Sequence, residues 1–221
     1  IFTALVFFSG KENFPLYHEG ERIFNGYSYL KYGNSINQAS YPILTQITGA
    51  FPLLFLDVDY PKDFNYTNPK VFGQKEFLYY GDNNAKEFIF LARIPFIFLG
   101  IILGIFVFVW ACEIFNYKAG LFALTLFSFS PLMIGYTPQV FADMTVTTYL
   151  FITTYFFWKF YKKPRPLFLV ISGVFFGLTL LSKPPGIFLL PILFVIGAIG
   201  IFTKKPIMIS SRERRPFYAL I

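Results

Sequence analysis

The sequence predicts an all-α polytopic membrane protein, and three observations lead to this fold class. Hydrophobic residues make up 55% of the 221 residues, aromatic residues 22% and charged residues only 14%, with a mean hydropathy of +0.55. Soluble domains carry about 25% charged residues, so this chain is too apolar for that class. The apolar residues form runs long enough to cross a bilayer, which needs about 20 residues. Many basic residues lie in short segments between these runs.

The net charge of +7 is interpreted as a marker of membrane topology. Lys and Arg accumulate in cytoplasmic loops, whereas nucleic-acid binding needs a basic patch on one folded face. We therefore expect the lipid bilayer as a partner and no nucleic acid. The chain has one cysteine, Cys112, and one histidine, His18. An intrachain disulfide or a Cys–His metal centre cannot be built from them, and we predict no metal site.

The N-terminal part is a short apolar segment followed by a longer mixed one. Residues 1–9 are too few to cross a bilayer, and we interpret them as the end of a truncated first span. Residues 10–87 hold nine of the twelve acidic and seven of the nineteen basic residues, which predicts a long extracytoplasmic loop that carries the chemistry. Interrupted apolar runs at 21–32 and 43–56 predict short interfacial helices. Residues 57–80 have the composition of a loop.

Residues 88–203 are predicted to form five transmembrane spans. Residues 119–158 hold one charge, Asp143, and as a single helix they would be about 60 Å long, twice the thickness of the hydrocarbon core. The chain must therefore fold back. Residues 166–203 repeat this pattern with one charge, Lys183, followed by Pro-Pro-Gly. The predicted spans are about 88–112, 119–135, 139–158, 166–182 and 185–203.

Loop charge predicts the orientation of these spans. Residues 159–165 carry four basic side chains and are expected in the cytoplasm. Residues 204–221 are also basic, and we interpret them as a cytoplasmic segment leading into a further span. Counting spans back from these segments places the Asp143 turn, the Lys183 turn and residues 10–87 together on the extracytoplasmic face.

Two pairs of glycines have the spacing that lets helices approach closely in a membrane. They are Gly100 with Gly104, and Gly173 with Gly177. We predict that these glycines serve helix packing rather than a functional site.

A few isolated charges are candidates for function. A carboxylate inside a span is costly, so Asp143 is either a functional acid or a group that stabilises a helix N-terminus. Lys183 is either an anion-binding group or an interfacial anchor. Both are predicted on the face that carries Glu19 and Glu21, where a carboxylate suits deprotonation of a hydroxyl and a lysine suits a phosphate. His18 is either a group that titrates near neutrality or an ordinary surface residue.

Several short motifs, in a fixed order, carry a family resemblance. They are Glu19-Gly20-Glu21, Gly26-Tyr27-Ser28-Tyr29-Leu30, Gly33, Asn37, Tyr41-Pro42, Phe51-Pro52-Leu53-Leu54, Phe72-Gly73, Glu76-Phe77-Leu78-Tyr79, Leu91-Ala92-Arg93-Ile94-Pro95, Phe129-Ser130-Pro131, Asp143, Gly173, Gly177 and Leu181-Ser182-Lys183. Together they resemble the dolichyl-phosphate-mannose-protein mannosyltransferases and their bacterial-type relatives in glycosyltransferase family 39. The chain is expected to be an N-terminal fragment of such a protein.

The resemblance implies a GT-C-type transmembrane helix bundle and an inverting hexosyltransferase. Such an enzyme moves a sugar from a polyprenyl-phosphate donor to an acceptor hydroxyl of a protein, lipid or glycan on the extracytoplasmic face, with no cofactor. The family carries an Asp-Glu pair in its first loop, with an acid as the catalytic base. Here the pair is His18-Glu19, and Ser40-Tyr41-Pro42 stands where many bacterial relatives have His-Pro-Pro. The base is then Glu19, Glu21 or His18, unless activity is altered or lost.

The remaining site predictions also follow from the resemblance. Glu19, His18 and Asp143 are the predicted catalytic residues, with Glu19 favoured as the base. The predicted substrate-binding residues are Lys183, Arg93, Glu21 and Tyr27, and Lys183 is expected near the lipid phosphate. The alternative for Arg93 is an arginine that reaches the membrane interface from its span. The location implied is a bacterial or archaeal plasma membrane. The alternative is a non-catalytic relative, either a carrier of lipid-linked sugar or a protein that binds the donor without transfer.

Overall fold

The computed structural model describes residues 1–16, 18–33, 43–60, 77–79 and 83–203, and this part of the chain is helical with no strands. The all-α prediction is therefore confirmed. The elements are α1 (Phe2–Glu12), α2 (Glu19–Tyr32), α3 (Ile43–Ala50), η1 (Phe51–Phe55), α5 (Phe77–Tyr79), α6 (Ala85–Ile114), α7 (Tyr117–Ser128), α8 (Pro131–Tyr136), α9 (Ala142–Lys162), α10 (Pro166–Ser182), η3 (Pro184–Phe188) and α11 (Leu189–Thr203).

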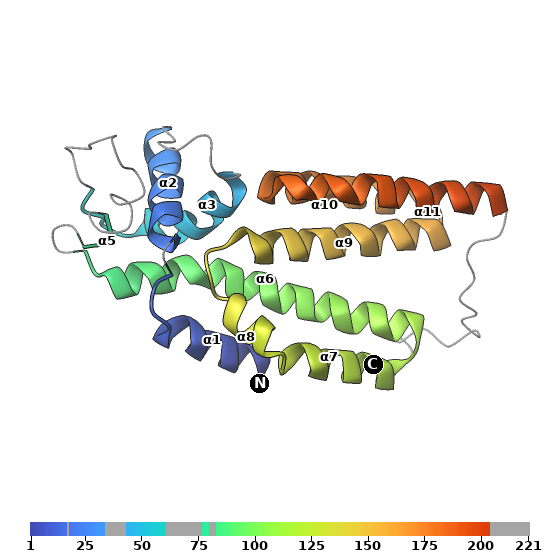
Figure 1. Cartoon of the computed structure of the whole chain (residues 1–221), viewed down its shortest axis with the longest axis horizontal. Helices are drawn as coiled ribbons and strands as arrows, with labels where there is room; N and C mark the ends of the chain where they lie inside the picture. Colours follow the sequence, from blue (N-terminus) through green and yellow to red (C-terminus); the bar gives the residue numbers. More distant parts are fainter. Residues whose placement is uncertain (17, 34–42, 61–76, 80–82, 204–221) are drawn as a thin grey trace.

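The long helices lie side by side, and the short helices of the predicted first loop cover one end of them. Figure 1 shows α6, α7, α9, α10 and α11 running along the long axis, with α2, α3 and α5 gathered at one end. α9 packs against both α6 and α10, and α2 packs against α3. The turns that contain Asp143 and Lys183 lie at the end covered by α2 and α3.

Local sequence explains several helix boundaries. The Asn84 side chain accepts a hydrogen bond from the Glu87 backbone N–H, which caps α6, and Asn116 caps α7 in the same way. Side-chain capping of this kind satisfies backbone donors that have no partner inside a helix. At its other end α2 stops at Gly33, whose φ of 69° lies in the left-handed region that glycine adopts without strain.

The structure agrees with the predicted elements of the first loop and shifts some span limits. The helix predicted over 21–32 begins two residues earlier, and the segment 43–56 divides into α3 and η1. The predicted span 119–135 is two helices, because Pro131 starts α8 and Ser130 before it is extended, with ψ of 118°. A proline disfavours helical backbone at the preceding residue. Most of the predicted loop 57–80 and all of 204–221 lie outside the described residues.

One described helix, α6, is long and apolar enough to cross a membrane. Its 30 residues correspond to about 45 Å, more than the hydrocarbon core requires. α10 with 17 residues and α11 with 15 are apolar but shorter. The five predicted spans therefore stay a prediction, of which α6 meets the length and composition required.

Close packing was predicted for both pairs of glycines, and the pair on α6 shows it. A Cβ at Gly100 would collide with the Thr137 side chain, and one at Gly104 would lie 3.0 Å from the Phe127 ring. A Cβ at Gly173 or Gly177 would meet no described atom within 4 Å. The packing prediction is thus confirmed for the pair on α6, while the pair on α10 makes no such approach in the described structure.

Candidate functional site

A buried ion pair joins the start of α2 to α6. The Arg93 guanidinium donates from Nε to Glu19 Oε1 at 3.0 Å and from Nη2 to Glu19 Oε2 at 2.6 Å. Its other N–H groups donate to the carbonyl oxygens of Gly10, Asn13 and Phe14 at 2.8, 2.9 and 3.2 Å. All five guanidinium donors are therefore used. Arg93 is 1% exposed and Glu19 is fully buried.

Glu19 also accepts two backbone hydrogen bonds. Val140 N–H donates to Oε1 at 3.0 Å, and Leu16 N–H donates to Oε2 at 2.9 Å. Each carboxylate oxygen thus accepts two hydrogen bonds, which is close to its full capacity. Glu19 cannot take a proton from an acceptor hydroxyl without breaking one of these bonds. The geometry is that of a residue that joins α1, α2, α6 and the segment before α9.

Arg22, one turn after Glu19 on α2, holds the same peptide segment from the other side. Its Nη1 donates to the Val140 carbonyl oxygen at 2.8 Å, and its guanidinium lies 4.0 Å from the centroid of the Phe141 ring. Residues three apart in a helix share a face. Glu19 therefore accepts a hydrogen bond from the Val140 N–H, while Arg22 on the same face donates one to the Val140 C=O. The segment they hold leads directly into Asp143, in the first turn of α9.

Asp143 and Lys183, predicted to lie on the same face, form an ion pair. Lys183 Nζ donates to Asp143 Oδ1 at 2.7 Å, and both side chains are about half exposed, at 43% for Lys183 and 51% for Asp143. Asp143 does not cap α9, whose N-cap residue is Phe141 with no side-chain cap bond. Lys183 ends α10. The pair therefore presents an accessible acid and an accessible base at the end of the bundle that α2 covers.

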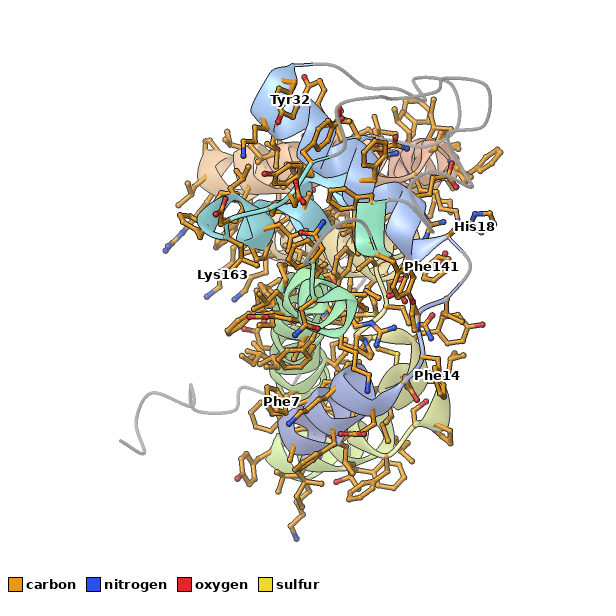
Figure 2. The ribbon with its side chains drawn as sticks, turned by 90° about the vertical axis from the view of Figure 1, so that its left-hand side faces the viewer. Phe7, Phe14, His18, Tyr32, Phe141 and Lys163 are labelled. Atoms are coloured by element: carbon orange, nitrogen blue, oxygen red, sulfur yellow. The ribbon has the colours of Figure 1, made fainter. Side chains whose placement is uncertain are left out.

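His18 and Glu21 form a second pair at the start of α2. His18 Nδ1 lies 3.2 Å from Glu21 Oε2; the His18 side chain is 32% exposed, whereas Glu21 is fully buried. Figure 2 shows His18 at the edge of the molecule, with its side chain pointing outward. When Nδ1 carries the proton and donates it to Glu21, Nε2 is the acceptor nitrogen of the ring.

Tyr27, predicted to bind substrate, is instead a core residue. It is fully buried, and its ring packs 5.8 Å from that of Phe77 and 6.1 Å from that of Tyr60, measured between centroids. Its hydroxyl accepts a hydrogen bond from Lys31 Nζ at 2.8 Å. This hydrogen bond raises the pKa of Lys31 above its ordinary value. The structure thus shows a packing role for Tyr27, and its predicted role in substrate binding stays a prediction.

The comparison with known families identifies the chain. The family model of the dolichyl-phosphate-mannose-protein mannosyltransferases matches residues 86–210, more than half of the 221 residues. The chain belongs to this family. No curated protein and no solved structure matched it. Membership of the mannosyltransferase family indicates a membrane glycosyltransferase. Helix α6, which is long and apolar enough to cross a membrane, agrees with a membrane protein.

The residues that match the mannosyltransferase family model include only part of the candidate site. Arg93, Asp143 and Lys183 lie within the matched residues, whereas His18 and Glu19 precede them. The described residues contain no group of three His, Cys, Asp or Glu side chains able to hold a metal ion. The sequence prediction that no metal takes part stays a prediction.

Arg22 and Val140 are the site residues that sequence reasoning missed. Arg22 is 6% exposed, and a basic residue one turn from Glu19 was the available signal. Val140 contributes only its backbone, so its side chain gave no indication. The two residues explain how α2 is fixed to the segment before Asp143.

Proposed function

We propose that the protein is an inverting hexosyltransferase that moves a sugar from a polyprenyl-phosphate donor to an acceptor hydroxyl on the extracytoplasmic face. The observation that carries this proposal is the accessible Asp143–Lys183 pair at 2.7 Å, at the end of the bundle that α2 and α3 cover. Loop charge supports the orientation, because the segment 159–165 lies at the opposite end. The family supports the lipid-linked donor.

In this proposal the general base is His18, oriented by Glu21. Both oxygens of Glu19 are already occupied by Arg93 and by backbone N–H groups, so we assign Glu19 a positioning role in place of the catalytic role favoured by sequence. His18 takes the proton of the acceptor hydroxyl. The freed oxygen attacks the anomeric carbon, and the bond from that carbon to the phosphate oxygen breaks with its electron pair. General base catalysis of this kind contributes roughly 10²- to 10⁴-fold.

Lys183 is proposed to bind the phosphate of the donor and to offset the charge that develops on it as it leaves. A lysine ammonium is a compact charge with three donors, suited to a phosphate whose charge increases in the transition state. Asp143 holds the ammonium at 2.7 Å in the unliganded protein. When Lys183 binds the donor phosphate instead of Asp143, the Asp143 carboxylate becomes available to orient the acceptor. The reaction then needs no resident cofactor.

A binding-only relative is the second candidate, and one observation favours it. His18 stands where the family resemblance places an acid. Such a protein would bind the lipid-linked sugar and yield no product at any pH. A carrier would move the donor across the membrane without releasing polyprenyl phosphate.

The experiment follows transfer from a labelled polyprenyl-phosphate mannose by the full-length protein in membrane vesicles, scoring polyprenyl phosphate and glycosylated acceptor separately. Release of polyprenyl phosphate that depends on acceptor is expected. His18→Ala should reduce it by at least 100-fold, and His18→Asp, which restores an acid, should retain it. Lys11→Gln, an exposed change on α1, serves as the matched control. Full transfer by His18→Ala would overturn the assignment of the base, and donor binding without any product would favour the binding-only relative.

A further inference from the structure

An aromatic cluster lies where α6 and α9 end, away from the candidate site. The rings of Trp110 and Trp158 lie 5.8 Å apart, and Tyr155 lies 5.8 Å from Trp110 and 6.1 Å from Trp158, between centroids. Figure 1 places this end of α6 and α9 opposite α2 and α3. These two tryptophans are the only two in the chain. Clustered Trp and Tyr side chains at the ends of apolar helices are typical of the headgroup level of a bilayer.

An ion pair beside this aromatic cluster neutralises the charge of Lys159. Lys159 Nζ donates to Glu113 Oε1 at 2.8 Å, and the Tyr155 hydroxyl donates to the same oxygen at 3.1 Å. Glu113 is the sole acid in residues 105–118 and 155–168, which together carry five basic residues. With Glu113 and Lys159 paired, four positive charges remain in these two segments.

The four remaining cations are Lys118, Lys162, Lys163 and Arg165. Lys162 Nζ lies 4.4 Å from the centroid of the Trp158 ring, and the other three residues are exposed. In the described part of the chain none of the four forms an ion pair with a carboxylate. Exposed cations beside an aromatic band at the ends of apolar helices match a surface that is itself anionic.

We infer that this end of the bundle is a contact surface for the headgroups of anionic phospholipids. The rings of Trp110 and Trp158 lie at the boundary between hydrocarbon and headgroups, with the buried Tyr155 ring packed against both. Lys162, Lys163 and Arg165 reach the lipid phosphates. Each basic residue near an anionic leaflet raises the affinity of the protein for that leaflet roughly fivefold. The inference rests on the membrane location of the protein and is independent of the transfer reaction.

Quenching of tryptophan fluorescence tests the inference, because both tryptophans lie in this cluster. The protein, with any tryptophan other than Trp110 and Trp158 replaced by phenylalanine, is placed in phosphatidylcholine vesicles with a minority of phosphatidylglycerol. The bromine quencher is carried on the acyl chains of one lipid or of the other. Brominated phosphatidylglycerol is expected to quench more strongly than the same fraction of brominated phosphatidylcholine. High salt should reduce this preference, since screening shortens the range of surface charges.

The combined variant Lys162→Gln, Lys163→Gln and Arg165→Gln should lower the preference for phosphatidylglycerol by roughly 100-fold, as three charges are lost. The matched control replaces three exposed lysines on other helices, Lys11, Lys31 and Lys86, with glutamine, and should keep the preference. Equal quenching by the two lipids, or equal loss in both variants, overturns the inference. Abolition of the preference by soluble glycerol phosphate would identify a free-phosphate site and would also overturn it.

Discussion

Glu19 and Arg93, 74 positions apart in sequence, form a bidentate pair in which every guanidinium donor and both carboxylate oxygens are bonded. Neither side chain is more than 2% exposed. Such a pair is weak evidence of net stabilisation, because desolvation offsets much of the attraction between the charges. Removing one partner is expected to lower the stability of the fold, since the other charge then stays buried without its partner.

The first prediction concerns stability. Glu19→Gln should lower the free energy of unfolding by about 3–5 kcal/mol, the usual cost of removing one partner of a buried pair. Arg93→Lys should also destabilise, because an ammonium cannot supply five donors in a planar fork. Denaturation of the detergent-solubilised protein measures both. Glu87→Gln, an exposed change on α6, is the control for Glu19→Gln. Unchanged stability of Glu19→Gln together with lost transfer would return Glu19 to a catalytic role.

The second prediction concerns the hydrogen bond from Arg22 to the Val140 carbonyl oxygen. Arg22→Gln should lower kcat by roughly 100-fold, the effect expected when a catalytic group is misplaced by about 1 Å. The KM for the donor should change little, because Arg22 contacts the segment before Asp143 rather than the proposed phosphate site. Arg22→Lys keeps a donor for the Val140 carbonyl and should recover part of the rate. Lys31→Gln on the same helix is the control. A rise in donor KM with unchanged kcat would argue for direct substrate binding by Arg22.

The third prediction separates stability from activity at the exposed pair. Asp143 and Lys183 are about half exposed, and such pairs contribute roughly 0–1 kcal/mol, so Lys183→Gln should leave the unfolding midpoint nearly unchanged. A hydrogen bond to a charged group is worth about 1.5–3 kcal/mol, so donor KM should rise roughly 10- to 150-fold. Kinetics against a series of donor concentrations measure this. Normal KM and kcat in Lys183→Gln would remove Lys183 from the proposed site.

The fourth prediction tests Glu21 as the residue that orients His18. Glu21 Oε2 lies 3.2 Å from His18 Nδ1, and Glu21→Gln keeps an acceptor for this nitrogen, so it should retain most of the transfer rate. Glu21→Ala removes the acceptor and should lower kcat by roughly 100-fold, the effect expected when a catalytic group is misplaced by about 1 Å. Transfer kinetics of the two variants measure the difference. Equal kcat in Glu21→Ala and in the wild type would show that Glu21 does not orient the base.

Sequence predicted the large features and missed the bonding within the site. The isolated charges of Asp143 and Lys183, each beside a proline-containing turn, were enough to predict that the two turns lie on the same face, because a charge inside an apolar span is costly. Their ion pair was not predicted. The occupation of Glu19 was not predictable. Its partners include the backbone N–H groups of Leu16 and Val140, and backbone donors at distant positions leave no pattern in the side chains.

Tyr27 shows a second limit of the sequence. It lies in a motif that carries the family resemblance, yet it is fully buried in the aromatic core. A shared motif residue can serve packing or chemistry, and an aromatic residue on a helix suits both. The structure shows the packing role, which depends on residues such as Phe77 that are distant in sequence.

The fifth prediction tests the packing of α6 with a matched control on α10. Gly100→Ala places a methyl group against Thr137 and should destabilise the protein by about 1–3 kcal/mol, the usual cost of overpacking. Gly173→Ala meets no described atom within 4 Å, so it should be neutral or should stabilise by up to about 1 kcal/mol through helix propensity. Thermal unfolding of the two variants measures the difference. Gly100→Ala combined with Thr137→Ser, which removes the methyl group that the new Cβ meets, should recover part of the loss. Equal stability of Gly100→Ala and Gly173→Ala would show that α6 does not pack this closely.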